Sequence, residues 1–176
     1  HMLSRVVVWG YLQYLIESGF VPTLLESYDH GIAKPAAYTL AFADHKQNVF
    51  VLDGFYEKEK TPEQLSDLIK EKRAQLVELK LIGSDYEWED VLADPSIFKR
   101  VSGNTKTVGV SLAGMFSELG LGMQRANSDI VGGIAKVQSY LSVDTSHEHP
   151  IDGTYGSPRL FFCNDLAFID NEFVDY

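Results

Sequence analysis

The chain has 176 residues, of which 45% are apolar and 23% are charged. This composition excludes a disordered or fibrous protein and predicts a single folded domain with a core of its own. The formal net charge of −10 argues against a general nucleic-acid coat, because affinity for phosphate backbones comes mainly from lysine and arginine. The charge is compatible with a nuclease, whose carboxylates carry negative charge that bound metal ions offset.

Residues 1–23 are predicted to form a leading segment, and residues 24–176 the domain itself. His1-Met2 looks like the scar of a cleaved tag, and the apolar positions Leu12 and Leu15 indicate a helical face. We expect this segment to be the tail of a connection from something upstream. The apolar stretch at 6–20 is too short and too interrupted for a membrane span, so no membrane partner is expected.

Three strands are predicted early in the chain, at residues 24–28, 37–43 and 49–56. The polar residues 44–48 fit a hairpin turn between the last two. A helix is expected from Thr61 to about Lys72, because threonine caps helices and Pro62 suits the first helical position. A short apolar strand at 91–93 ends at Asp94, which Pro95 biases towards extended geometry.

The second half of the chain predicts two helices, a long loop, a strand and a last short helix. The first helix is expected at 110–119, and the second is capped by Asn127-Ser128 and runs to Leu141. Its apolar stripe is predicted to be core and consists of Ile130, Ile134, Val137 and Leu141. The loop is expected at 142–158, the strand at 159–163 and the last helix at 165–173. This order of elements predicts an α/β protein with a ribonuclease H-like mixed β-sheet flanked by helices.

Two aspartates stand where predicted strands end. Asp29 follows the first strand, and Asp94 follows the strand at 91–93. In a ribonuclease H-like sheet these strands are neighbours, so the two acids are expected to meet in one site for Mg²⁺ or Mn²⁺. Such a site predicts two-metal hydrolysis of a phosphodiester, in which one ion activates water and the other stabilises the leaving oxygen. Taken singly, Asp29 equally fits a turn residue and Asp94 an aspartate before a proline turn.

Other polar residues are weaker candidates for a functional site. Lys99 and Arg100 are candidates for contact with a phosphate backbone, with ordinary surface charge as the alternative. His147 and His149 predict a solvated loop rather than a zinc site. Residues 103–107 lack the first glycine and the preceding strand of a phosphate loop, so no ATP-binding motif is predicted.

Five segments in order resemble a known family: YDHGIAKPAAYTLAF, NVFVLDGFYEKEKTPEQL, VLADPSIFKR, DIVGGIAKVQSYL and GSPRLFFCNDLAFIDNEFVDY. Over about residues 22–176 they are similar to the C-terminal nuclease domain of phage large terminase subunits. The resemblance implies an endonuclease that uses Mg²⁺ or Mn²⁺ to cut concatemeric duplex viral DNA during packaging. It maps the first family acid onto Asp29 and the second onto Asp94.

The resemblance also implies partners and a location. The partners would be double-stranded DNA, an upstream ATPase domain of the same polypeptide, the portal and the small terminase subunit, in the host cell cytoplasm. The third family acid lies in an Asp-His-x-x-Asp-Ala-like motif, which is expected beyond Tyr176. Weaker substitutes within the chain are Asp53, Asp165, Asp170 and Asp175.

Two alternatives remain open at the level of sequence. One is a catalytically silent ribonuclease H-like module that docks on DNA or on the portal, which the acidic charge and the missing third acid favour. The other is a different nuclease of the same fold, such as a junction resolvase.

Overall fold

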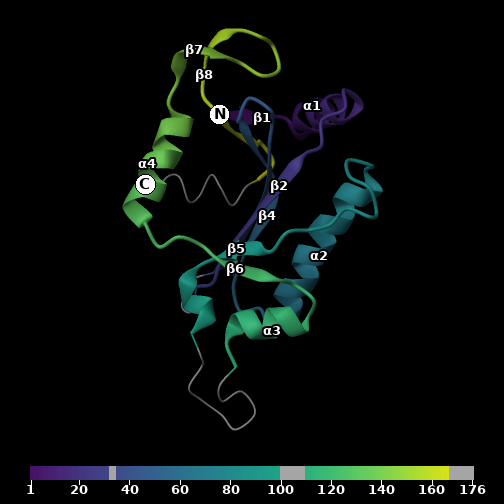
Figure 1. The fold of residues 1–176 in the computed structure, drawn as a ribbon, viewed down its shortest axis with the longest axis vertical. Helices are drawn as coiled ribbons and strands as arrows, with labels where there is room; N and C mark the ends of the chain where they lie inside the picture. Colours follow the sequence, from purple (N-terminus) through teal and green to yellow (C-terminus); the bar gives the residue numbers. More distant parts are fainter. Residues whose placement is uncertain (32–34, 100–109, 167–176) are drawn as a thin grey trace. The chain divides into compact units, whose positions relative to one another are not determined.

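The structure is a computed structural model that describes residues 1–31, 35–99 and 110–166. Within these ranges the chain forms a seven-stranded sheet, a two-stranded sheet and four α-helices, which confirms the predicted mixed α/β class (Figure 1). The strands are β1 (Met2–Leu3), β2 (Thr23–Asp29), β3 (Ala36–Ala43), β4 (Val49–Glu57), β5 (Val91–Ala93), β6 (Met123–Arg125), β7 (Asp144–Glu148), β8 (Tyr155–Ser157) and β9 (Leu160–Cys163). The helices are α1 (Arg5–Glu17), α2 (Pro62–Glu78), α3 (Leu112–Glu118) and α4 (Ile130–Leu141), with a 3₁₀ turn, η1, at Pro95–Phe98. Among the described helices, none has the length and apolar character needed to cross a membrane.

The large sheet has the strand order β1-β9-β4-β3-β2-β5-β6. Its centre is the predicted meander of β2, β3 and β4, whose short connections require antiparallel neighbours. Parallel strands join on both sides: β9 pairs with β4, β5 pairs with β2, and β6 pairs with β5. The sheet is therefore mixed, and the strand at 91–93 lies next to the first strand of the meander, as predicted.

Two compact units make up the chain. The first contains His1–Leu25, Leu40–Asp53 and Asp129–Tyr176, and the second contains Glu26–Thr39 and Gly54–Ser128. Each unit has its own buried residues. In the first unit Phe42, Phe50 and Phe161 stack face to face, with ring centroids 4.8 and 5.0 Å apart.

Local sequence explains the helices of the second unit. Thr61 and Gln64 form a reciprocal capping box at the start of α2, and Pro62 occupies the first helical position. The helix continues to Glu78, about one and a half turns beyond the predicted end near Lys72. Its residues Leu65, Ile69 and Leu76 are buried. The short helix α3 lies beside β6 and buries Phe116 (Figure 1).

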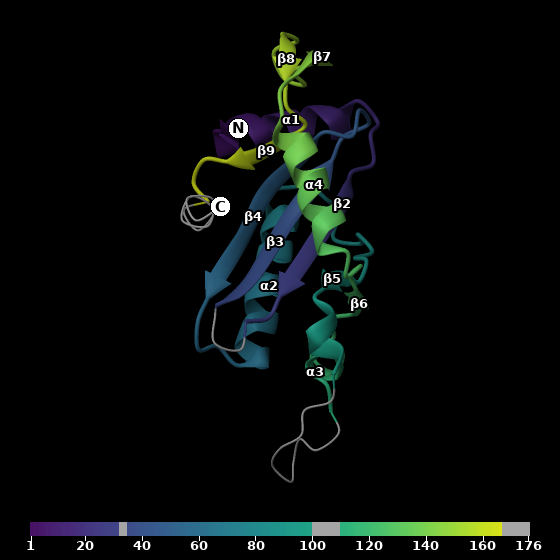
Figure 2. The same cartoon turned by 90° about the vertical axis from the view of Figure 1, so that its left-hand side faces the viewer.

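The predicted loop at 142–158 is wrong, because the structure forms the β7–β8 hairpin there. Figure 2 shows this hairpin beyond the C-terminal end of α4. Local hydrogen bonds support it: Asp152 accepts from Thr154 in the turn, and Asp144 accepts from Ser146 within β7. Both strands are largely exposed, so they lack the apolar alternation by which a strand is predicted from sequence.

The predicted core stripe on α4 is also wrong. No residue of this helix is buried, and Ile130 and Val131 are 74% and 80% exposed. Helical spacing of apolar residues predicts that a helix has an apolar face, but it does not specify what covers that face. The predicted last helix at 165–173 lies mostly outside the described residues, and Asp165 itself is in a turn.

Candidate functional site

The two aspartates predicted to form a metal site belong to the second unit and stand where two neighbouring parallel strands end, Asp29 as the last residue of β2 and Asp94 directly after β5. The register of β2 and β5 pairs Ser27 with Leu92 and Tyr28 with Ala93. One residue further along each strand stand Asp29 and Asp94. Because neighbouring strands are about 4.8 Å apart, the backbones of these two residues lie side by side at the carboxyl edge of the sheet.

Alternation of side chains along the strands indicates which face each acid uses. In β2, Tyr28 is buried while Ser27 and Asp29 are exposed, and in β5 Leu92 is exposed while Ala93 is buried. Side chains two residues apart along a strand share a face, so Asp29 lies on the face of Ser27. Asp94 comes directly after β5 and is the N-cap of the 3₁₀ turn η1. Asp29 is thus on the exposed face of β2, and the register of the strands brings the backbone of Asp94 beside it.

Asp94 is held in place by the turn that follows it. Its Oδ1 accepts a hydrogen bond of 2.7 Å from the backbone N–H of Ser96, which caps the 3₁₀ turn η1. Hydrogen bonds from Ser96, together with the positive charge of Lys99, lower the pKa of Asp94 below its usual range. The residue is thus ionised at neutral pH, and since a carboxylate offers about four lone-pair positions, the cap and a metal ion can both be served.

On the buried side of β2, next to Asp29, the side chains are aromatic. Tyr28 packs edge-to-face on Phe116, with ring centroids 5.2 Å apart, and its hydroxyl is hydrogen-bonded to Nδ1 of His30 at 2.8 Å. Burial raises the pKa of Tyr28 and lowers the pKa of His30, although the charge of Asp29 opposes the second effect. A neutral pair next to Asp29 adds no cation that would compete for its carboxylate.

Cations stand near the same edge. Arg125 ends β6 in register with Ala93, and β5 and β6 lie side by side (Figure 1). The guanidinium of Arg125 lies over the ring of Phe98, 5.1 Å from its centroid, which directs it towards the turn that begins after Asp94. Lys99 ends the same turn, whereas the predicted Arg100 lies outside the described residues. Sequence reasoning missed Arg125 because a strand of three residues is too short to show alternation.

The weaker acidic candidates have other partners or lie outside the described residues. Arg5 forms ion pairs with Asp53, at 3.5 Å, and with Asp165, so both acids belong to a structural cluster of the first unit. Asp170 and Asp175 fall outside the described residues. Within the described residues, no group of three or more His, Cys, Asp or Glu side chains is arranged to hold a metal ion. A pair of carboxylates such as Asp29 and Asp94 would fit an ion that takes its remaining ligands from water and phosphate.

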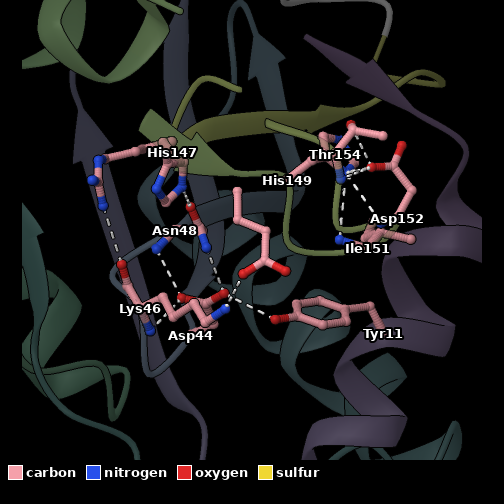
Figure 3. Close-up of polar contacts among 11 residues, drawn as sticks. Tyr11, Asp44, Lys46, Asn48, His147, His149, Ile151, Asp152 and Thr154 are labelled. Atoms are coloured by element: carbon pink, nitrogen blue, oxygen red, sulfur yellow. Dashed lines mark hydrogen bonds and ion pairs between the residues drawn. The ribbon is translucent and has the colours of Figure 1, made fainter. Parts of the chain in front are cut away.

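The histidines at 147 and 149 are structural residues (Figure 3). His147 is only 7% exposed, and its Nε2 is hydrogen-bonded to Oδ1 of Asn48 at 2.6 Å, so the predicted solvated loop is wrong for this residue. Asn48 donates in turn to Asp44, which also accepts a hydrogen bond from the hydroxyl of Tyr11. His149 contacts Asp152 at 3.3 Å within the hairpin. His147 therefore ties the β7–β8 hairpin to the β3–β4 turn, whereas His149 contributes to the turn of the hairpin itself.

No protein-family model matches the chain, and no curated protein matches it in sequence. Solved structures do match its fold. The nuclease domain of the P22 large terminase superposes with a TM-score of 0.56 at 14% identity, covering 88% of this chain and 68% of that one. The large terminase from a thermophilic bacteriophage matches in two crystal forms, with TM-scores of 0.51 and 0.50 at 16% and 14% identity.

The matches to the thermophilic phage terminase cover 88% and 86% of this chain but only 32% and 30% of that protein, so the chain spans about a third of that relative. At such low identity the likeness concerns the fold. The chain has the mixed α/β, ribonuclease H-like fold of large terminase nuclease domains, which confirms the predicted architecture and the family likeness at this level.

Proposed function

We propose that this chain is a metal-dependent DNA endonuclease domain of a phage DNA-packaging large terminase. One observation carries the proposal: the parallel register of β2 and β5 sets Asp29 beside Asp94 at the carboxyl edge of the sheet. Strand ends of this kind are the usual ligand-binding edge of α/β sheets. The fold shared with the P22 nuclease domain supports the same conclusion.

Asp29 and Asp94 would hold Mg²⁺ or Mn²⁺ through hard oxygen ligands. When bound, such ions supply an activated water and charge stabilisation for the leaving oxygen of a phosphodiester. The protein's own contribution is position and charge. Asp94 remains ionised because Ser96 donates to it, and Arg125 and Lys99 bring positive charge to the edge where phosphate oxygens would lie.

The substrate of this domain would be concatemeric duplex DNA, cut in the host cell cytoplasm. In the whole protein we expect an upstream ATPase domain on the same polypeptide, with the portal and the small terminase subunit as further partners. The third acid expected from the resemblance would complete the two-ion site.

A second candidate function is a catalytically silent module that docks on DNA or on the portal. The observation that favours it is that no third ligating side chain joins Asp29 and Asp94 within the described residues. A junction resolvase of the same fold is distinguished by its substrate, since it would prefer branched DNA over linear duplex.

The test is cleavage of supercoiled plasmid with Mn²⁺ or Mg²⁺ by the wild-type chain, Asp29→Asn and Asp94→Asn. Asparagine keeps the size of aspartate and the Ser96 cap but removes the charge that a metal ion needs. The matched control is Asp67→Asn, which removes an exposed acid from α2 in the same unit. Cutting that both site variants lose and the control keeps supports the nuclease. Cutting that survives in both site variants contradicts it, and metal binding without cutting of any DNA favours the docking module.

A further inference from the structure

Glu26 is a buried carboxylate on the strand that leads to Asp29. It lies three residues before Asp29 and is only 7% exposed. Arg73 of α2 donates to both of its oxygens, from Nε to Oε1 at 2.9 Å and from Nη2 to Oε2 at 2.6 Å. The hydroxyl of Tyr38, on β3, also donates to Oε1. The buried charge therefore has a bidentate partner and a third hydrogen bond, which is what a carboxylate in a core requires.

The other side of Arg73 contacts the segment that leads to Asp94. Its guanidinium carbon lies 4.5 Å from the ring centroid of Trp88, and Trp88 stands three residues before the start of β5. Trp88 is supported by Tyr86, whose ring packs edge-on at 5.2 Å. A guanidinium is planar, so its edge can bind the carboxylate while its face stacks on the indole. One side chain thus joins the approach to Asp29 with the approach to Asp94.

The sheet itself holds these two acids together weakly. β5 has three residues, and two register pairs connect it to β2. A slip of one residue would move Asp94 by about 3.3 Å along the strand and turn its side chain to the opposite face. Replacing a buried ion pair by apolar residues is often neutral or stabilising, so a buried pair is better explained by the arrangement it specifies than by stability.

We propose that Arg73 is a positioning residue for the candidate metal site, because it clamps β2 and β5 in the register that sets Asp29 beside Asp94. The proposal rests on the proposed function for its catalytic meaning, whereas the clamp itself is a property of the fold. In this clamp Arg73 binds Glu26 on β2 and stacks on Trp88 in the segment before β5.

The test compares Arg73→Lys with the wild-type chain. Lysine keeps a positive charge near Glu26 but lacks both the fork and the flat face. The control is Arg5→Lys, which alters the arginine paired with Asp53 and Asp165 in the first unit. The first readout is hydrogen exchange of the Asp94 amide, which donates to the carbonyl oxygen of Tyr28 across the β2–β5 ladder. We expect its exchange to accelerate about tenfold in Arg73→Lys, while the Leu121 amide, bonded to Phe116, keeps its rate.

The second readout is the Mn²⁺ concentration that half-saturates the chain, which calorimetric titration measures. We expect this concentration to rise about tenfold in Arg73→Lys and to be unchanged in Arg5→Lys. A purely structural arginine would lower Tm and leave Mn²⁺ affinity alone, which would overturn the proposal. Trp88→Leu removes only the stacked face, and we expect a smaller change in the same direction, so the test survives if Arg73→Lys does not fold.

The outcomes separate the clamp from the function. If the Asp94 amide exchanges at the wild-type rate in Arg73→Lys and in Trp88→Leu, the clamp is overturned. Absence of Mn²⁺ binding by the wild-type chain would count against the proposed nuclease, and the exchange comparison would still decide whether Arg73 sets the register.

Discussion

The backbone N–H of Asp94 donates to the carbonyl oxygen of Tyr28 at 3.1 Å. This bond continues the parallel ladder one step beyond the pair of Tyr28 and Ala93, to the level where both strands reach an aspartate. Backbone pairing thereby brings the two aspartates side by side, although the ladder that does so is short. A site built on strand ends is positioned more accurately than one built on loops.

Loss of either strand-end carboxylate should weaken metal binding even when no DNA is present. We expect Asp29→Asn and Asp94→Asn each to weaken Mn²⁺ binding about tenfold or more, because each removes a charged oxygen ligand from a site that has few. Calorimetric titration of the chain with Mn²⁺ measures this directly. Asp67→Asn should bind as the wild type does, and equal binding by all four proteins would refute the site.

Arg125 should contribute to DNA affinity but not to metal affinity. It stands at the end of β6, beside the strand that leads to Asp94, and its guanidinium lies over Phe98. In Arg125→Gln we expect weaker duplex binding at every sequence. The slope of log affinity against log salt should become shallower by about one, the value for the loss of one phosphate contact. Fluorescence anisotropy over a salt series, without divalent ions, gives this slope. Lys58→Gln, on an exposed lysine of the same unit, is the control. A slope unchanged from wild type would remove Arg125 from the DNA-binding surface.

Local chemistry made much of this fold predictable from sequence. The meander strands and the start of α2 follow from apolar runs, a polar turn and the threonine cap, which all act over a few residues. The pairing of β2 with β5 followed from the order of elements. The partnership of Glu26 with Arg73 was not predictable, since the two residues are 47 positions apart and nothing local links them. The exposed hairpin β7–β8 was missed for the opposite reason, because its local signals are turns without apolar strands.

The capping box of α2 should contribute measurably to the free energy of unfolding. The hydroxyl of Thr61 accepts from the N–H of Gln64, and the side chain of Gln64 accepts from the N–H of Thr61. Thr61→Ala should lower the free energy of unfolding by about 1 kcal/mol, because it removes the hydroxyl that accepts from the N–H of Gln64 while the backbone N–H of residue 61 remains. Urea denaturation provides the measurement. Thr61→Ser keeps the oxygen and should lose much less, so equal losses in the two variants would contradict the capping explanation.

The buried histidine of the first unit should make stability depend on pH. Burial lowers the pKa of His147, helped by the charge of Arg159, and the nearby acids Asp144 and Asp44 oppose this while Lys46 adds to it. An unfolded histidine has a pKa of about 6.5, so below that pH the unfolded chain binds more protons than the folded one. The contribution of neutral His147 is therefore complete above about pH 6.5 and is lost as the pH falls towards the lower folded value.

His147→Gln should flatten this dependence between pH 7 and pH 5. The glutamine amide can still donate to Oδ1 of Asn48 but does not titrate, so the variant should lose less stability on acidification than the wild type does. Urea denaturation at both pH values measures the difference, and taking the difference from wild type cancels the contribution of His30. Tyr11→Phe removes a different hydrogen bond of the same network, to Asp44, and should cost about 1 kcal/mol equally at both pH values. A pH dependence of His147→Gln identical to that of the wild type would show that protonation of His147 is not coupled to folding.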